Sequence, residues 1–262
     1  MATKLVPTDV MKAFSDNQIE EAFEDLLSLY WSDEDELEIH KLRQVFEANL
    51  RRKEFFPSIS MSNVESLSQK SILKEYLISW GDRYFNAKIP SQHQGTASKS
   101  PYDVMVYRLL SYEVNFPLDE DLARKTHEMA MQSENLIGEL LKEFINSRIA
   151  QYGWIWCKGP CMVATDFYYP GNPEIYLQVK NKFNTENSSS SKIRTGTSIQ
   201  KWNRLTSKRV PGTDLATSNW EALRAIVFDE AGIRSNNRSA LSEEGFADFI
   251  KTVCEKNPNI IL

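Results

Sequence analysis

Apolar residues recur every three or four positions through much of the first half of this 262-residue chain. The spacing predicts three amphipathic helices between residues 8 and 56 and another over residues 63–86. The acidic run at residues 32–35 suits the positive N-terminal end of a helix dipole, and we interpret it as a solvated helix face. Pro57 separates the two helical stretches, because proline does not continue a helix. The pattern indicates an all-helical N-terminal region.

The longest helical signal covers residues 118–151. Gly138 lies within it and predicts either a break into two helices or the close approach of another backbone. Residues 89–100 are polar and rich in Ser and Gln, which indicates a linker or, equally, a surface loop. We expect residues 1–100 to form a helical N-terminal region, or a subdomain of one compact domain. Residues 101–262 would form the core.

The hydrophobic period changes after this helix. Short aromatic and apolar runs at residues 154–157 and 162–164 flank Lys158-Gly159-Pro160, which predicts a hairpin. Residues 174–180 then alternate strictly between apolar and polar, as a strand does. One face of this strand carries Ile175, Leu177 and Val179, and the other carries Glu174, Tyr176, Gln178 and Lys180.

Helical patterns return toward the C-terminus. Residues 199–205 are long enough for one or two helical turns, and residues 220–231 predict a helix. Ser242, followed by two glutamates, is a typical start for a last helix. Helices on both sides of short strands predict an α/β (α+β) fold with flanking helices.

Composition limits the chemistry. With 41% hydrophobic and 11% aromatic residues, the chain can bury a core and should be soluble. No apolar run approaches the roughly 20 residues of a membrane span, so the cytoplasm is the expected location. The three cysteines and three histidines lack zinc-ligand spacing or a nearby nucleophile. Catalysis would therefore use carboxylates, lysine and a metal ion.

The net charge of −5 is unevenly distributed. Residues 1–60 carry 13 acidic against 7 basic side chains, a balance of −6. Residues 174–209 carry 8 basic against 2 acidic side chains, a balance of +6. A cationic block in an acidic protein is typical of a local phosphate contact.

Three residues near the alternating strand suit phosphodiester hydrolysis. Asp166 follows a short apolar run, and Gln178 and Lys180 lie two residues apart on one strand face. Mg²⁺ prefers oxygen ligands and activates water. We expect Asp166 to anchor the metal and Gln178 to be the second oxygen ligand. Lys180 would lie near the attacking water and the phosphate.

The pattern Asp166…Gln178-Val179-Lys180 resembles the PD-(D/E)XK motif of type II restriction endonucleases. The sequence QVKNKFNTENSSSSKIRTGT and the later IQKWNR are similar to the SinI-type enzymes, which recognise GG(A/T)CC. The resemblance covers residues 134–206 and implies a mixed-sheet PD-(D/E)XK nuclease core. Thr165 stands where the motif has Pro, and Gln178 stands where it has an acid. The metal site therefore lacks one negative charge.

The missing charge gives a helical carboxylate more weight. Members of the superfamily often add an acid from a preceding helix, and Glu139 and Glu143 lie on one face of the last helix before the strands. Glu143 is the first choice as catalytic residue and metal ligand, and Glu139 is the alternative. The competing interpretation is an exposed acidic pair without a catalytic role.

The segment after Lys180 is expected to contact DNA. Its basic and amide side chains can bind guanine, adenine or phosphate. By composition alone the serine run is a flexible linker, whereas the resemblance favours a recognition segment over residues 184–209. The expected DNA contacts are Asn187, Ser188, Ser189, Lys192, Arg194, Thr195, Lys201, Asn203 and Arg204.

These observations predict a Mg²⁺-dependent type II restriction endonuclease that makes double-strand breaks at a GGWCC-like site. A palindromic site needs two active centres, so a homodimer is expected. The resemblance also implies a cognate DNA methyltransferase. One alternative is a non-catalytic DNA-binding protein with a nuclease-like core, which Gln178 favours. Another is a helical interaction protein whose acidic half binds a partner.

Overall fold

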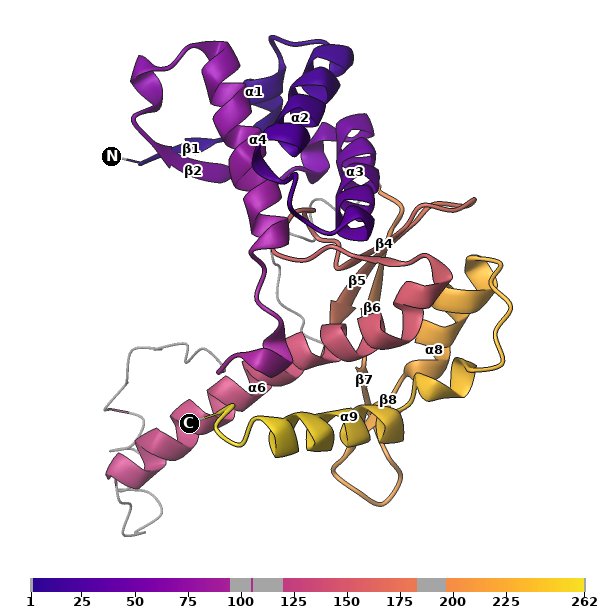
Figure 1. Ribbon diagram of the computed structural model, residues 1–262. Helices are drawn as coiled ribbons and strands as arrows, with labels where there is room; N and C mark the ends of the chain where they lie inside the picture. The colour runs from indigo at the N-terminus through magenta and orange to yellow at the C-terminus, as the bar shows by residue number, and fades with distance from the viewer. Residues whose placement is uncertain (1, 95–104, 106–119, 183–196, 262) are drawn as a thin grey trace. The chain divides into compact units, whose positions relative to one another are not determined.

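The computed structural model of the protein describes residues 2–94, 105, 120–182 and 197–261 (Figure 1). The chain folds into two compact units. The first combines Met1–Lys88 with Asn146–Leu241, and the second combines Ile89–Ile145 with Ser242–Leu262. The division at residue 100 stays a prediction, because the residues around it lie outside the described ranges.

The predicted N-terminal helices are present, and their starts follow from local sequence. Ser15 and Gln18 form a capping box at the start of the second helix. Asp35 caps the third helix by accepting the backbone N–H groups of Leu37 and Glu38. The elements of this part are β1 (Ala2–Leu5), α1 (Pro7–Met11), α2 (Asp16–Tyr30), α3 (Glu36–Arg51), β2 (Ile59–Ser62) and α4 (Gln69–Phe85).

The prediction of an all-helical N-terminal region is wrong in one respect. β1 and β2 form an antiparallel two-stranded sheet, in which Leu5 is paired with Ile59. Each strand has only four residues and its partner lies more than fifty residues away. A local periodicity cannot detect such a pairing, because the stabilising contacts are non-local.

An aromatic cluster packs the N-terminal helices together. The rings of Phe23 and Phe46 are stacked with centroids 3.9 Å apart, and Trp80 lies edge-on to both at 5.8 Å. The indole N–H of Trp80 and the side-chain amide of Asn49 both donate to the carbonyl oxygen of Cys161, at 2.7 and 2.9 Å. This core therefore fixes the segment that leads into the central sheet.

The central sheet of the first unit is mixed, and the predicted mixed-sheet α/β fold is confirmed. Its strand order is β3-β4-β5-β6, with antiparallel pairing in the first two pairs and parallel pairing between β5 and β6. Figure 1 shows β4, β5 and β6 beneath α3. The strands are β3 (Ile155–Trp156), β4 (Phe167–Tyr169), β5 (Ile175–Lys180) and β6 (Ile199–Asn203).

The predicted hairpin between residues 154–157 and 162–164 is wrong. β3 pairs instead with β4, so that Ile155 lies opposite Tyr168. Residues 162–164 form a turn whose polar groups bind the N-terminal helices; the N–H of Val163 donates to the carbonyl of Phe55 at 2.8 Å. Their apolar side chains serve packing against those helices, and a short apolar run does not distinguish this from a strand.

The predicted helical turns at residues 199–205 are also wrong. Residues 199–203 form β6, and Tyr176 is paired with Ile199 in the parallel register. Trp202 is buried on the opposite face of the sheet, where its ring lies 5.2 Å from that of Trp220. Five residues are too few for the strand and helix periods to be told apart.

The C-terminal part of the first unit covers the sheet face on which Trp202 lies. Trp154 donates its indole N–H to the carbonyl of Val227 at 3.2 Å, and the side chains of Leu177 and Val179 are buried. The predicted helix over residues 220–231 is present as α8 followed by a π-helical turn. The elements are β7 (Leu205–Arg209), β8 (Ala216–Ser218), α8 (Trp220–Arg224) and the π turn (Ala225–Glu230).

The second unit contains most of α6 (Glu120–Ile149) and all of α9 (Glu243–Lys256). Phe144 packs against Phe246, with ring centroids 5.4 Å apart. α6 is continuous at Gly138, and among the described residues no atom outside the local helix lies within 4 Å of the position that a Cβ would occupy there. Neither predicted role of this glycine, a helix break or a close backbone approach, is found. Within the described ranges, no helix is both long and apolar enough to cross a bilayer.

Candidate active site

Asp166 lies immediately before β4 and is held by three hydrogen bonds. Its backbone N–H donates to the carbonyl of Leu177 at 2.8 Å, and its own carbonyl accepts the N–H of Cys157 at 2.9 Å. Its side-chain Oδ2 accepts the N–H of Val179 at 2.8 Å. The β4–β5 pairing ends at Phe167 and Leu177, and these bonds hold Asp166 at that end, with its carboxylate on the backbone of Val179.

Gln178 and Lys180 lie on one face of β5, on either side of the Val179 backbone that Asp166 contacts. Gln178 is only 4% exposed, whereas Lys180, at the end of β5, is exposed. The strand therefore presents a buried amide and a solvent-accessible ammonium group one step further along. Val179, between them, points to the opposite and buried face.

β6 extends this polar face by two residues. Lys201 is the register partner of Gln178, and Asn203 is the register partner of Lys180. Partners in a parallel pair project to the same side of the sheet. The Oδ1 atom of Asn203 is buried and has no hydrogen-bond partner among the described residues. β5 and β6 therefore bring Gln178, Lys180, Lys201 and Asn203 to one face, and the Asp166 carboxylate reaches β5 at Val179, between Gln178 and Lys180.

A carboxylate network occupies the same face next to these residues. Glu174 accepts hydrogen bonds from the hydroxyls of Tyr168 and Tyr176, at 2.8 and 3.1 Å, and forms an ion pair with Arg51. Burial and the Glu174 carboxylate raise the pKa of both phenols, that of Tyr176 to about 12. Both hydroxyls therefore remain protonated donors near neutral pH. The network joins the end of α3 to β4 and β5.

Arg51 is a residue that the sequence-based prediction missed. It belongs to the basic run Arg51-Arg52-Lys53, which stands in an otherwise acidic region. That contrast was the available signal. Its meaning depends on the folded chain, which brings the end of α3 to strands more than a hundred residues away (Figure 1).

The two helical glutamates lie on the part of α6 that belongs to the second unit. Glu143 accepts the backbone N–H of Ser91 at 2.8 Å and the hydroxyl of Ser91 at 2.5 Å. Glu139 forms an ion pair with Lys142 at 2.8 Å. Each carboxylate thus has a partner inside its own unit. A role in the metal site stays a prediction for both.

The predicted DNA contacts are described only in part. Lys201 and Asn203 lie on the polar face of the sheet. Arg204 donates from Nε to the side chain of Asn181 at 2.9 Å, and its N–H donates to the carbonyl of Lys180 at 2.9 Å. The other predicted contacts, which lie outside the described residues, are Asn187, Ser188, Ser189, Lys192, Arg194 and Thr195.

The oxygen donors on this face fit a hydrated Mg²⁺ ion. The Asp166 carboxylate lies at the backbone of Val179, the residue after Gln178, and Mg²⁺ commonly binds one or two carboxylates while it keeps several waters. Within the described ranges, no three His, Cys, Asp or Glu side chains cluster closely enough to hold a metal. The residues therefore suit an ion that retains much of its water, and they do not form a closed protein cage.

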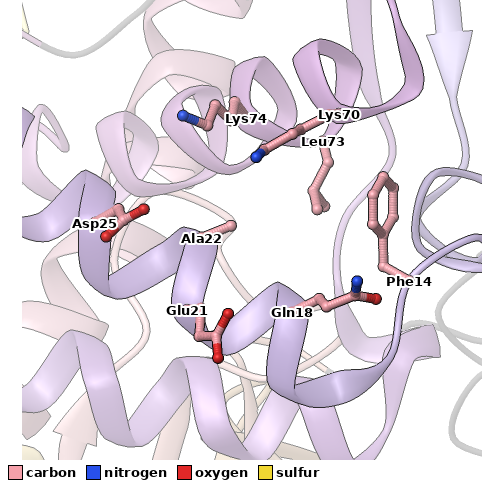
Figure 2. A pocket seen from close by; sticks show the side chains of 8 residues that line it. All are labelled: Phe14, Gln18, Glu21, Ala22, Asp25, Lys70, Leu73 and Lys74. Carbon is pink, nitrogen blue, oxygen red and sulfur yellow. The ribbon is translucent and has the colours of Figure 1, made fainter.

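A separate hollow of about 190 Å³ lies between α2 and α4 (Figure 2). Its lining includes Glu21 and Asp25 of α2 and Lys70 and Lys74 of α4. The two acids and the two lysines balance in charge, so the hollow offers no anion or cation preference. The polar face of the central sheet is therefore the stronger candidate for chemistry on a polyanion.

A mixed sheet with an amide and a lysine on one face and an aspartate carboxylate at the backbone between them defines a nuclease-like core, and comparisons with known proteins identify its class. The family of the SinI restriction endonuclease matches residues 57–256. The type II restriction enzyme Eco47I of Escherichia coli is 31% identical over 205 residues, which cover 77% of this chain and 82% of that protein. The type II restriction enzyme SinI of Salmonella infantis is 36% identical over 159 residues, which cover 59% of this chain and 62% of that enzyme.

The chain belongs to the SinI restriction endonuclease family. The prediction of a type II restriction endonuclease resembling the SinI-type enzymes is therefore confirmed at the level of the family. The match begins at residue 57, after most of the N-terminal helices.

Proposed function

We propose that this protein makes site-specific double-strand breaks in DNA by Mg²⁺-dependent hydrolysis of a phosphodiester. The observation that carries the proposal is the hydrogen bond from the Val179 N–H to the Asp166 carboxylate, because Val179 lies between Gln178 and Lys180 on β5. Membership of the SinI restriction endonuclease family supports the same reaction. The recognition site would be GGWCC-like, because the central segment resembles the SinI-type enzymes.

Each of the three residues has a distinct role in the proposal. Asp166 and Gln178 would hold Mg²⁺ through their side-chain oxygens, with Glu143 as the further ligand and Glu139 as its alternative. When bound, the ion would supply activation of a water molecule and neutralisation of charge that develops on the phosphate. Lys180 would place its ammonium group beside that water and the scissile phosphate, where it stabilises negative charge.

The proposed role of Glu143 has a structural condition. Its carboxylate is bound to Ser91, so it must exchange that partner in order to bind a metal. Glu139 must likewise leave Lys142. Metal titration of Glu143→Gln and Glu139→Gln variants would separate the two, because only the true ligand weakens the Mg²⁺ dependence of cleavage.

DNA recognition is assigned to the segment that follows Lys180. Lys201, Asn203 and Arg204 would bind bases or phosphates, together with the predicted contacts between residues 187 and 195. A palindromic site is read by two copies of the chain, so the proposed active form is a homodimer. A cognate DNA methyltransferase and a cytoplasmic location complete the proposal, since host DNA of the same sequence must be protected.

A non-catalytic DNA-binding protein is the second candidate. Gln178 favours it, because an amide brings less negative charge to a metal than the carboxylate that the family motif usually has. Salt-sensitive DNA binding without metal-dependent cutting would select this alternative.

The test is digestion of plasmid DNA with Mg²⁺ by the wild-type chain and by Lys180→Ala. Discrete fragments are expected from the wild type, and the variant should bind the same DNA but cut it at least about a hundredfold more slowly. Lys251→Ala, an exposed lysine of α9, is the matched control and should cut normally. Cutting by Lys180→Ala at the control rate would remove this lysine from the site.

A further inference from the structure

We propose that Arg52, which follows α3, binds a phosphate of the DNA strand that crosses the catalytic face. The inference rests on the proposed endonuclease function. It assigns a role in DNA binding to the N-terminal helical region, through the basic run at the end of α3.

Arg52 lies on the same sheet face as the catalytic residues. Its guanidinium carbon is 5.7 Å from the ring centroid of Tyr176 and 5.6 Å from that of Phe55. Tyr176 projects to the same side of β5 as Gln178 and Lys180. The aromatic rings support the guanidinium plane and reduce the entropy that Arg52 loses when it binds a ligand.

Arg52 differs from its two neighbours in the basic run because its charge is not paired with an acid of the described residues. Arg51 is paired with Glu174, and Lys53 is paired with Asp16 at 2.7 Å. Arg52 donates to the hydroxyl of Ser198 at 3.5 Å, and no carboxylate of the described residues lies within ion-pair distance of it. Its positive charge is therefore balanced by no acid in the described ranges.

Arg52 completes a row of cations along the face. It lies at the level of Tyr176, Lys201 at the level of Gln178, and Lys180 one further step along β5. Three cations on one face fit a ligand with several negative charges. The backbone of a DNA strand is such a ligand.

A purely structural role is the competing explanation. In that case Arg52 would hold the end of α3 on the sheet through its contacts with Phe55 and Tyr176. Arg52→Met separates the two roles, because an unbranched apolar side chain keeps packing on the rings and loses the charge. Arg52→Gln is the second variant, since its amide can still donate to Ser198.

The experiment measures the affinity of the full chain for a fluorescent duplex containing GGACC, with EDTA present to prevent cleavage, across a series of salt concentrations. Arg52→Met and Arg52→Gln each remove one phosphate contact. The negative slope of log K against log salt should therefore become shallower by about 0.9 in each variant. Arg43→Met is the matched control. It removes an arginine of α3 that is bound to Glu24, at 2.8 and 2.9 Å, and it should keep the wild-type slope.

If the wild type binds and cuts DNA, an unchanged salt slope in the folded Arg52→Met and Arg52→Gln variants would overturn this inference. A lowered melting temperature with an unchanged slope would assign Arg52 to packing. Failure of the wild type itself to bind the duplex at low salt would instead overturn the proposed function together with the inference.

Discussion

The carboxylate of Asp166 accepts a hydrogen bond from the backbone N–H of Val179 at 2.8 Å. The side chain thus replaces a ladder hydrogen bond at the point where β4 begins and β5 continues. This contact fixes the carboxylate at the backbone of Val179, between Gln178 and Lys180 in the strand. The Asp166 carboxylate therefore aligns two strands and also contributes negative charge to the candidate metal site.

Asp166→Asn should separate these two functions. The amide oxygen can still accept the N–H of Val179, so the fold and DNA binding should persist, while the loss of charge should slow cleavage by at least about a hundredfold. Asp166→Ala leaves that N–H without its acceptor and should cost a further 1–3 kcal/mol of folding stability, as an order of magnitude. Plasmid cleavage and thermal unfolding measure the two effects. Asp248→Asn, on an exposed part of α9, is the control and should change neither.

The strand that carries Gln178 and Lys180 could be predicted from the sequence because it depends on a local pattern. Strict alternation over residues 174–180 places Gln178 and Lys180 on one face, as the structure has them. Lys201 and Asn203 were expected to contact DNA, but residues 199–205 were expected to be helical. Only the parallel register reveals that these two residues lie on the same sheet face as Gln178 and Lys180.

The remaining features depend on contacts between distant parts of the chain. Arg51 and Arg52 reach the sheet because the whole N-terminal core holds α3 there, and no local pattern encodes that placement. The predicted strand at residues 162–164 failed for a related reason. Its apolar side chains pack against the N-terminal helices, so burial arises without strand pairing.

Gln178→Glu should restore the acid that the family motif usually has. A second carboxylate should lower the Mg²⁺ concentration for half-maximal cleavage by about tenfold. Gln178 is buried, and the Asp166 carboxylate lies at the backbone of the next residue, so the pKa of the introduced acid should be raised by burial and by the like charge. The gain should therefore be larger at pH 8 than at pH 6. An identical Mg²⁺ dependence of the two proteins at pH 8 would show that residue 178 does not bind the ion.

The ion pairs of Glu38 predict a pH-dependent contribution to stability. Burial alone would raise the pKa of Glu38, but hydrogen bonds and charge from Lys158 and Lys41 lower it from 4.5 to about 2. The folded-state pKa lies below the unfolded value, so this stabilisation is present above pH 4.5 and is lost as the pH falls toward 2.

Glu38→Gln should consequently destabilise the protein at pH 7 by about 1–2 kcal/mol, a value reduced for solvent screening. The difference from the wild type should shrink as the pH is lowered. Urea unfolding at several pH values measures it. Glu36→Gln, an exposed position at the start of α3, is the control, and a constant difference at every pH would contradict the assignment.

Two helical glycines predict opposite responses to the same substitution. In the part of the chain that the structure describes, no atom beyond the local helix lies within 4 Å of a Cβ at Gly138, so Gly138→Ala should stabilise the protein by about 0.5–1 kcal/mol through helix propensity. A Cβ at Gly81 would lie 2.4 Å from the Trp31 ring, so Gly81→Ala should destabilise it. Thermal unfolding of the two variants checks the pair. Equal changes in melting temperature would contradict the open surroundings of Gly138 and the close contact of Gly81 with Trp31.

The central claim is that the site formed by Asp166, Gln178 and Lys180 cuts DNA at one sequence. Mapping of the fragment ends released from a sequenced plasmid with Mg²⁺ tests it most directly. The account predicts ends at a single recurring position within GGWCC-like sites for the wild type, and none for Asp166→Asn. Ends scattered without a common sequence, or no cleavage with any divalent metal, would contradict it.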